Sequence, residues 1–156
     1  MQESEDAQMN QSALEGFVKI VEMDSFSAAA EALYLSQSAL SQQIRIRLAM
    51  IDAPEREQPF STEATKKLSE LLHTGIVRLK VKCIDKYNRE VAFVYCEGKD
   101  VSAEMLKEGM ALHYHMNFDD CELYDRIQAR IQQDKKGLWS QNKVEKPWEY
   151  RKKHSK

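Results

Sequence analysis

The chain has 156 residues, of which 42% are hydrophobic and 31% are charged. These values are typical of a globular protein with one hydrophobic core and a small appendage. The formal net charge is only −2, so charge alone selects neither nucleic acid nor a membrane surface as a partner. No apolar run approaches the about 20 residues that cross a bilayer, and the acidic N-terminus carries no apolar signal segment. We therefore expect a cytoplasmic protein with no membrane partner.

Cysteine content and charge distribution indicate the redox state of the thiols and the part of the chain that could bind nucleic acid. Cys83, Cys96 and Cys121 are odd in number and lack the spacing of metal ligands, so we expect reduced thiols rather than a disulfide framework. Residues 1–45 carry two Lys or Arg against seven Asp or Glu, whereas residues 46–156 carry 21 against 18. The later part is therefore the better electrostatic candidate for binding nucleic acid.

The N-terminal third has a helical pattern behind a short tail. Residues 1–11 are polar and acidic, which predicts a disordered tail, and residues 12–45 follow helical spacing. Ser25 or Ser27 is suited to cap a second helix, and Ser36 a third, because short hydroxyl side chains accept hydrogen bonds from the first backbone N–H groups of a helix.

A short strand with an acidic end follows. Apolar and polar residues alternate over Ile44–Met50, which predicts a half-buried strand. Pro54 lacks a backbone donor and keeps the preceding residue extended, so the strand should stop near Asp52. The strand end thus gathers Arg47, Asp52 and Glu55. Cleavage of a phosphodiester bond needs such a cation for the phosphate, a carboxylate for a metal and a carboxylate to activate water.

The middle of the chain alternates between helix and strand. The amphipathic pattern over residues 61–72 predicts a helix. Residues 76–85 alternate as a strand, and Asn88 is suited to a left-handed turn position. A second strand over residues 90–96 should end in a turn at Glu97 and Gly98.

The last third is mostly helical in pattern. We expect a helix over Val101–Gly109 and a long helix over Leu123–Lys136 that stops at Gly137. Residues 111–116 are ambiguous between strand and loop. Residues 143–156 are rich in Lys and Arg, which predicts a basic, mobile tail.

Part of the N-terminal third resembles the helix-turn-helix of LysR-type transcription regulators. The similar stretch lies within residues 12–45 and includes the runs SFSAAAEALYL and SQSALSQQI. In that family the second run would enter the major groove of DNA. No wing and no effector-binding domain follow here, and the segment is acidic, whereas duplex binding depends on neutralising phosphates. The resemblance implies a fragment of a DNA-binding transcription regulator, which we rank as the third hypothesis.

Residues 46–156 resemble the staphylococcal nuclease-like (thermonuclease) family. Five motifs carry the resemblance, in the order that the family has them: RLAMIDAPE, QPFSTEATKKL, DKYNREVAFVY, GKDVSAEMLKEGMA and KKGLW. The resemblance implies an α+β fold for residues 46–142, with a five-stranded OB-fold barrel and three helices. It also implies calcium-dependent hydrolysis of phosphodiester bonds in DNA or RNA.

The resemblance assigns roles to individual residues. Arg47 and Arg89 match the two arginines that bind phosphate, whose planar forks suit phosphate oxygens better than lysine does. Asp52 matches a calcium ligand, with the backbone carbonyl of Ala53 close to the ion. Glu55 matches the proposed general base for the attacking water.

Further positions match the nucleotide site of the family. Asp85 and Tyr87 correspond to residues that shape this site, and Tyr114 and His115 lie where nucleotide-contacting tyrosines often occur. Ordinary structural roles compete with these assignments. Arg89 could pair with Asp85 across a hairpin, and Tyr87 considered alone is assigned to the core rather than to base stacking.

One motif of the family is missing. Its first two strands carry Gly-x-Val-x-x-Val-x-Asp-Gly-Asp-Thr, whose aspartate is another calcium ligand, and only a forced alignment puts Asp24 in this role. The loss predicts an incomplete barrel with exposed strand edges, weaker calcium binding and slower hydrolysis. A non-catalytic nucleic-acid-binding or interaction module is therefore the second hypothesis. His113, His115 and Cys121 are assigned to packing or to the surface, since no metal-ligand spacing connects them.

Overall fold

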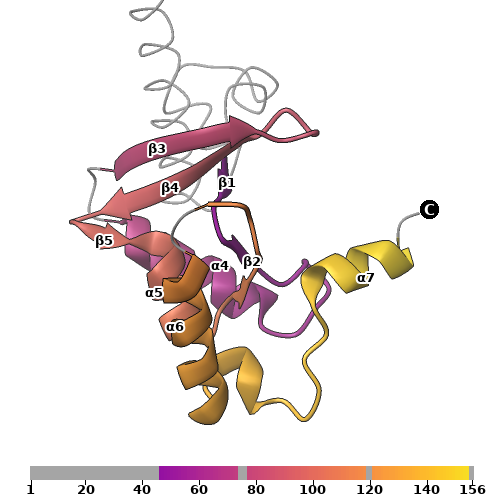
Figure 1. The fold of residues 1–156 in the computed structure, drawn as a ribbon. Coiled ribbons are helices and arrows are strands. Elements are labelled where there is room, and N and C mark those ends of the chain that lie inside the picture. The colour runs from indigo at the N-terminus through magenta and orange to yellow at the C-terminus, as the bar shows by residue number, and fades with distance from the viewer. Residues whose placement is uncertain (1–45, 74–76, 119–120, 155–156) are drawn as a thin grey trace, which may run out of the picture.

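The structure is a computed structural model that describes residues 46–73, 77–118 and 121–154. These residues form an α+β fold in which helices pack beside a small, strongly bent sheet (Figure 1). The helices predicted within residues 12–45, and Asp24, lie outside the described residues.

The predicted strand at the start of the domain is two short strands. β1 (Ile46–Leu48) pairs in parallel with the central strand, and β2 (Ile51–Asp52) turns away to a second sheet. Met50 between them is fully buried and adopts a left-handed backbone with φ of 67°. The simple alternation of buried and exposed residues therefore fails at this position. The end of the strand at Asp52 is confirmed, and it places this carboxylate at the mouth of the loop that contains Pro54.

The sheet is organised around β4 (Glu90–Cys96), which is mostly buried. It pairs in parallel with β1 on one side and antiparallel with β3 (Val77–Ile84) on the other. The hairpin turn between β3 and β4 contains Asn88 with φ of 58°, as predicted.

Two shorter strands complete the pairing. β5 (Lys99–Asp100) follows a tight turn and pairs with the end of β4. β6 (Leu112–His113) pairs with β2 in a separate two-stranded sheet. The ambiguous stretch over residues 111–116 thus begins as a strand and continues as an irregular segment.

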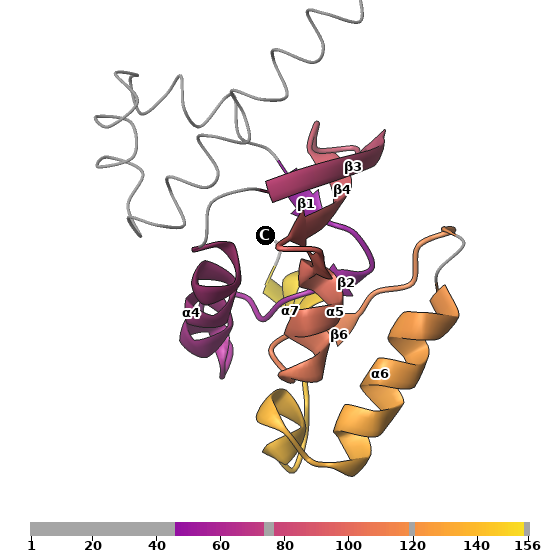
Figure 2. The ribbon, with the colours of Figure 1, turned by 90° about the vertical axis from the view of Figure 1, so that its left-hand side faces the viewer.

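Three helices pack together against the sheet. α4 (Ser61–Leu72) confirms the predicted helix. α5 (Val101–Lys107) begins where Asp100 accepts a hydrogen bond from the backbone N–H of Ala103. α6 (Cys121–Gln133) begins two residues earlier than predicted. α5 lies between α4 and α6, as Figure 2 shows. This central place explains why most of its side chains are buried.

Two glycines join the end of α5 to the end of α6. Gly109 and Gly137 have φ of 66° and 56°, and a Cβ on either residue would lie 2.4 Å from a backbone oxygen of the other segment. The backbone N–H of Leu138, in the 3-10 helix η1 (Gly137–Ser140), donates to the Gly109 carbonyl over 2.8 Å. Only glycine fits this close crossing, which accounts for the glycines of the GMA and KKGLW motifs.

The basic C-terminal segment is helical over most of its described residues. Pro147–His154 forms helix α7, with Arg151, Lys152 and Lys153 in its last turn. Arg151 pairs with Asp52 and Glu55 of the acidic loop, whereas Lys153 pairs with Glu145 just before the helix. The segment is therefore a helix docked beside the acidic loop, and its mobility stays a prediction.

The buried core and the exposed face of β3 agree with an OB-like fold of the nuclease type. Phe93, Val94, Met105, Leu106 and Tyr124 are among the fully buried side chains. Much of β3 is exposed, and Ile84 retains 64% of its accessible surface. None of the helices in the described ranges is long and apolar enough to cross a membrane.

Candidate functional site

A polar cleft of about 510 Å³ lies between the acidic loop after β2, the β3–β4 hairpin and α7. Six of the seven side chains predicted from the sequence line this cleft: Arg47, Asp52, Glu55, Tyr87, Arg89 and Tyr114. The seventh, Asp85, accepts hydrogen bonds from two of these residues, Tyr87 and Arg89. The structure thus brings together residues that are up to 67 positions apart in the sequence.

The two acidic side chains of the cleft share one cation, the guanidinium of Arg151. Its Nη2 lies 2.6 Å from Oδ2 of Asp52, and its Nη1 lies 3.2 Å from Oδ1 of Asp52 and 2.5 Å from Oε1 of Glu55. The hydrogen bonds that Arg151 donates to Asp52, and then the one that it donates to Glu55, raise the pKa of Arg151, although partial burial lowers it. Both carboxylates are therefore held close enough to bind a single positive charge.

Arg89 is held in place by Asp85. Its Nε and Nη2 each lie 2.7 Å from Oδ2 of Asp85, and Oδ1 accepts backbone hydrogen bonds from Tyr87 and Arg89. Burial raises the pKa of Asp85, but the side chain and backbone of Arg89 outweigh this effect and lower it. The pairing across the hairpin is confirmed. It also aims the other side of the arginine fork at the cleft.

Arg47 is stacked on one aromatic ring, that of Tyr114, rather than paired with a described carboxylate. Its guanidinium carbon lies 4.8 Å from the ring centre of Tyr114, and this ring makes an edge contact with Trp148 of α7 at 5.3 Å. The backbone N–H of Tyr114 donates to the Met50 carbonyl over 2.9 Å. This bond fixes the tyrosine beside the phosphate-binding candidate.

Tyr87 lies at the outer edge of the cleft. Its side chain is 58% exposed, so the assignment of this residue to the core is wrong. Arg89 and Lys86 approach its ring at 5.2 and 4.9 Å. An exposed aromatic ring between two cations can stack on a base while its neighbours contact phosphate.

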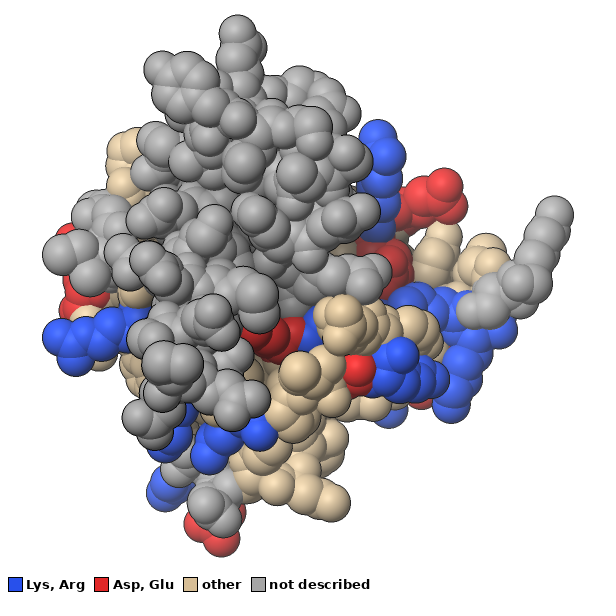
Figure 3. All heavy atoms as spheres, turned by 90° about the horizontal axis from the view of Figure 1, so that it is seen from above, with Lys and Arg blue, Asp and Glu red and all other residues tan. Residues whose placement is uncertain are grey.

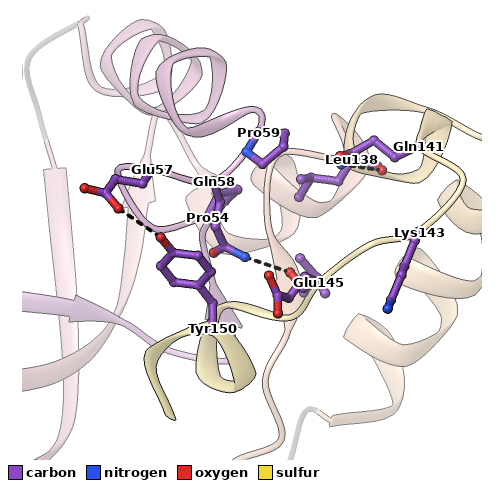
Figure 4. A pocket seen from close by; sticks show the side chains of 10 residues that line it. Pro54, Glu57, Gln58, Pro59, Leu138, Gln141, Lys143, Glu145 and Tyr150 are labelled. Atoms are coloured by element: carbon purple, nitrogen blue, oxygen red, sulfur yellow. Dashed lines mark hydrogen bonds between the residues drawn. The ribbon is translucent and has the colours of Figure 1, made fainter. Parts of the chain in front are cut away.

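The segment before α7 is anchored beside the acidic loop. Oε1 of Gln58 accepts the backbone N–H of Glu55 over 2.9 Å, and its Nε2 donates to the Glu145 carbonyl over 3.0 Å. The Tyr150 hydroxyl donates to Glu57 over 3.0 Å. Gln58, Glu145, Glu57 and Tyr150 line a cavity of about 310 Å³, and Figure 4 shows the Gln58–Glu145 and Glu57–Tyr150 hydrogen bonds among its lining residues. They place α7 where Arg151 can reach the carboxylates.

Several lining residues were not predicted: Lys86, Trp148, Arg151 and Lys152. Three of them belong to α7, whose short basic sequence has no amphipathic periodicity that could predict a docked helix. Figure 3 shows Lys and Arg side chains gathered at the side of the molecule where the chain ends. The run of basic residues was the available signal, but it is equally typical of a solvated tail.

A second cluster lies where β6 meets α6. His113, His115 and Cys121 present ligand atoms that all lie within 4.8 Å of one another. From the sequence we predicted packing or surface positions for these residues, and this prediction holds for each residue considered alone. It missed their proximity, because a turn after the strand brings the start of α6 back to the histidines.

The chemistry of the first cluster fits a hard cation. Asp52 and Glu55 offer carboxylate oxygens, which are the ligands that Ca²⁺ prefers. The guanidinium that bridges them acts as a stand-in for such a charge. Neighbouring arginines then supply the positive groups that a phosphate needs.

Comparison with known proteins agrees with this geometry. Residues 45–141 match the family described as staphylococcal nuclease homologue, and residues 11–46 match the bacterial regulatory helix-turn-helix proteins of the lysR family. The chain is 35% identical to a staphylococcal-like nuclease of Arabidopsis thaliana over 76% of its own length and 36% of that protein.

Two further relatives come from distant organisms. An uncharacterized endonuclease of Haemophilus influenzae is 39% identical, with 69% of this chain and 60% of that protein covered. A probable endonuclease of Saccharomyces cerevisiae is 43% identical, with 70% of this chain and 46% of that protein covered. The chain thus spans less than two thirds of each of these relatives. Because the family match covers more than half of the sequence, the chain belongs to the staphylococcal nuclease homologue family.

Proposed function

We propose that the chain hydrolyses phosphodiester bonds of DNA or RNA with the help of Ca²⁺. The observation that carries this proposal is one cleft that combines two carboxylates with Arg47 and Arg89 in a member of a nuclease family. Relatives named as nucleases and endonucleases support a nucleic-acid substrate.

Each side chain has a separate task in this proposal. Asp52 and the Ala53 carbonyl would hold Ca²⁺, which supplies positive charge for the phosphate and the attacking water. Glu55 accepts the proton of that water. Arg47 and Arg89 donate to the phosphate oxygens as negative charge builds on them. Asp85 acts through Arg89 as a positioning residue, since it fixes the guanidinium from behind.

Arg151 must release its two carboxylates before they can serve these roles. Its guanidinium is 42% exposed and comes from the last turn of a short helix, so it can swing out without disturbing the core. Its departure would leave Asp52 and Glu55 facing each other, and a divalent cation would then replace the lost positive charge. Arg151 would thereby weaken the apparent affinity for Ca²⁺.

The test is plasmid nicking by the full chain in Ca²⁺ and in excess chelator. Glu55→Gln removes the general base and keeps the shape of the side chain, so cleavage should fall by about 10²- to 10⁴-fold. Glu63→Gln, on the exposed face of α4, is the matched control and should cleave as the wild type does. Equal rates for Glu55→Gln and the wild type would end the enzyme proposal.

A non-catalytic nucleic-acid-binding module is the second candidate. The filled cation position at Arg151 and the missing upstream motif of the family both favour it. Mobility-shift assays with single- and double-stranded nucleic acid separate it from the enzyme. Binding together with no calcium-dependent cleavage would support this candidate.

A DNA-binding regulator fragment is the third candidate, favoured by the helix-turn-helix match at residues 11–46. It predicts that deletion of residues 1–45 abolishes binding to duplex DNA. Retained binding would count against it.

A further inference from the structure

We propose that His113, His115 and Cys121 form a zinc site that is separate from the carboxylate cleft. Their ligand atoms lie within 4.8 Å of one another, and they join the end of β6 to the start of α6. Two imidazoles and one sulfur are the donors that zinc prefers, whereas calcium prefers oxygen. Such a site can bind zinc through three protein ligands and a water.

The buried histidine supplies independent evidence for this site. His113 is only 4% exposed, and its Nε2 is one of two buried side-chain atoms in the described residues that lack a hydrogen-bond partner. A buried nitrogen without a partner loses its hydration and gains nothing in exchange.

Asp125 orients both rings from behind. Its Oδ1 lies 3.0 Å from Nδ1 of His113 and 3.3 Å from Nε2 of His115, and the two ring centres are 4.4 Å apart. Nε2 of His113, which has no hydrogen-bond partner among the described residues, remains to bind the ion, and the exposed His115 ring can turn to offer a nitrogen. A carboxylate on the far nitrogen of a histidine ligand is the usual outer support of a zinc site.

Cys121 approaches as the first residue of α6. Its thiol donates to the carbonyls of Met116 and Phe118 over 3.0 and 3.3 Å. Binding of zinc forms a zinc–sulfur bond and releases the thiol proton to water, which leaves the charge balanced. The positive end of the helix favours the resulting sulfur anion.

The three ligand atoms need to move only a short distance to bind zinc. Ligand atoms around tetrahedral zinc are separated by about 3.4–3.8 Å, so the three atoms need to approach one another by about 1 Å. The His115 side chain is 70% exposed and can turn without a cost in packing. Residues alternate in this extended segment, so Tyr114 projects away from the histidines and toward Arg47. A zinc ion would therefore fix the backbone that positions Tyr114 in the cleft.

The test is calorimetric titration of the untagged, metal-stripped full chain with Zn²⁺ in excess Ca²⁺, so that oxygen-ligand sites are filled. We expect one zinc ion per chain. Cys121→Ser should weaken binding by more than about tenfold, and Asp125→Asn by about 10- to 100-fold. Cys83→Ser, an exposed cysteine on β3, is the matched control and should bind as the wild type does.

A second measurement has a wild-type arm that does not depend on how well any variant folds. Co²⁺ bound to the wild-type chain should give sulfur-to-cobalt charge-transfer absorption in the near ultraviolet. This band should persist in Cys83→Ser and vanish in Cys121→Ser. The proposal is overturned if the wild type binds no zinc, or if its cobalt complex lacks this band. This outcome is independent of nuclease activity.

Discussion

The domain has two clusters of candidate metal ligands that differ in chemistry. The carboxylate cluster is Asp52 with Glu55, and the histidine cluster is His113 and His115 with Cys121. The carboxylate cluster offers oxygens that are already neutralised by Arg151, and the histidine cluster offers nitrogen and sulfur around one buried nitrogen that lacks a partner among the described residues. The first suits a hard cation that competes with a guanidinium, and the second suits zinc. Donor type, rather than proximity alone, is therefore the basis on which we propose calcium for the first cluster and zinc for the second.

The comparison also shows how one segment serves both clusters. Tyr114 contacts Arg47 at the cleft, while the residues on either side of it face α6. Because the two clusters share no proposed ligand, a substitution in one should nevertheless leave ion binding at the other intact.

Arg89→Lys should give the largest effect. Lysine keeps the charge but loses the fork that binds Asp85 and phosphate together, so cleavage should fall by about 10²- to 10³-fold. Single-turnover cleavage of a labelled oligonucleotide measures this effect. Zinc affinity measured on the same preparation should be unchanged. A variant with the wild-type cleavage rate would show that Arg89 has only the hairpin role.

Arg151→Gln should act in the opposite direction on calcium. It removes two exposed ion pairs that compete with the metal, so calcium affinity should rise by about three- to tenfold. Calorimetry measures the affinity, and Trp148 fluorescence reports the movement of α7. Lys153→Gln is the matched control, because Lys153 pairs with Glu145 outside the cleft. An unchanged affinity in Arg151→Gln would mean that the guanidinium does not compete.

Asp85→Asn should give the smallest effect of these substitutions. The effect is on the stability of the folded chain, and it shows mainly when the pH is lowered. The pKa of Asp85 is lower in the folded chain, so its contribution to stability is complete above the unfolded value of about 3.9 and is lost as the pH falls through the folded value. Urea unfolding at pH 7 and pH 3 should therefore show a smaller loss of stability in the variant than in the wild type. An equal loss in both would contradict this role for the Asp85–Arg89 pair.

Much of this arrangement could be predicted from the sequence, because local rules determine it. The helix over residues 61–72, the hairpin turn at Asn88 and the strand end at Asp52 follow from periodicity and turn chemistry. The cleft residues were found through ordered motifs. The domain boundaries and the roles of individual site residues remain predictions.

The remaining features depend on contacts between distant parts of the chain. The kink at Met50 needs a buried left-handed residue, which no alternation pattern indicates. The docking of α7 depends on pairing between Arg151 and carboxylates about 100 residues earlier. The histidine cluster depends on how α6 folds back against β6, so residue spacing alone could not reveal it.

The calcium dependence of cleavage in Asp52→Asn, compared with His115→Gln, tests whether the carboxylate cleft is the hydrolytic metal site. Both substitutions remove one candidate ligand and change little volume. We expect that Asp52→Asn requires much more Ca²⁺ for half-maximal cleavage or loses cleavage altogether, while His115→Gln keeps the wild-type calcium curve. An unshifted calcium curve for Asp52→Asn would contradict the assignment of the carboxylate cleft as the hydrolytic metal site.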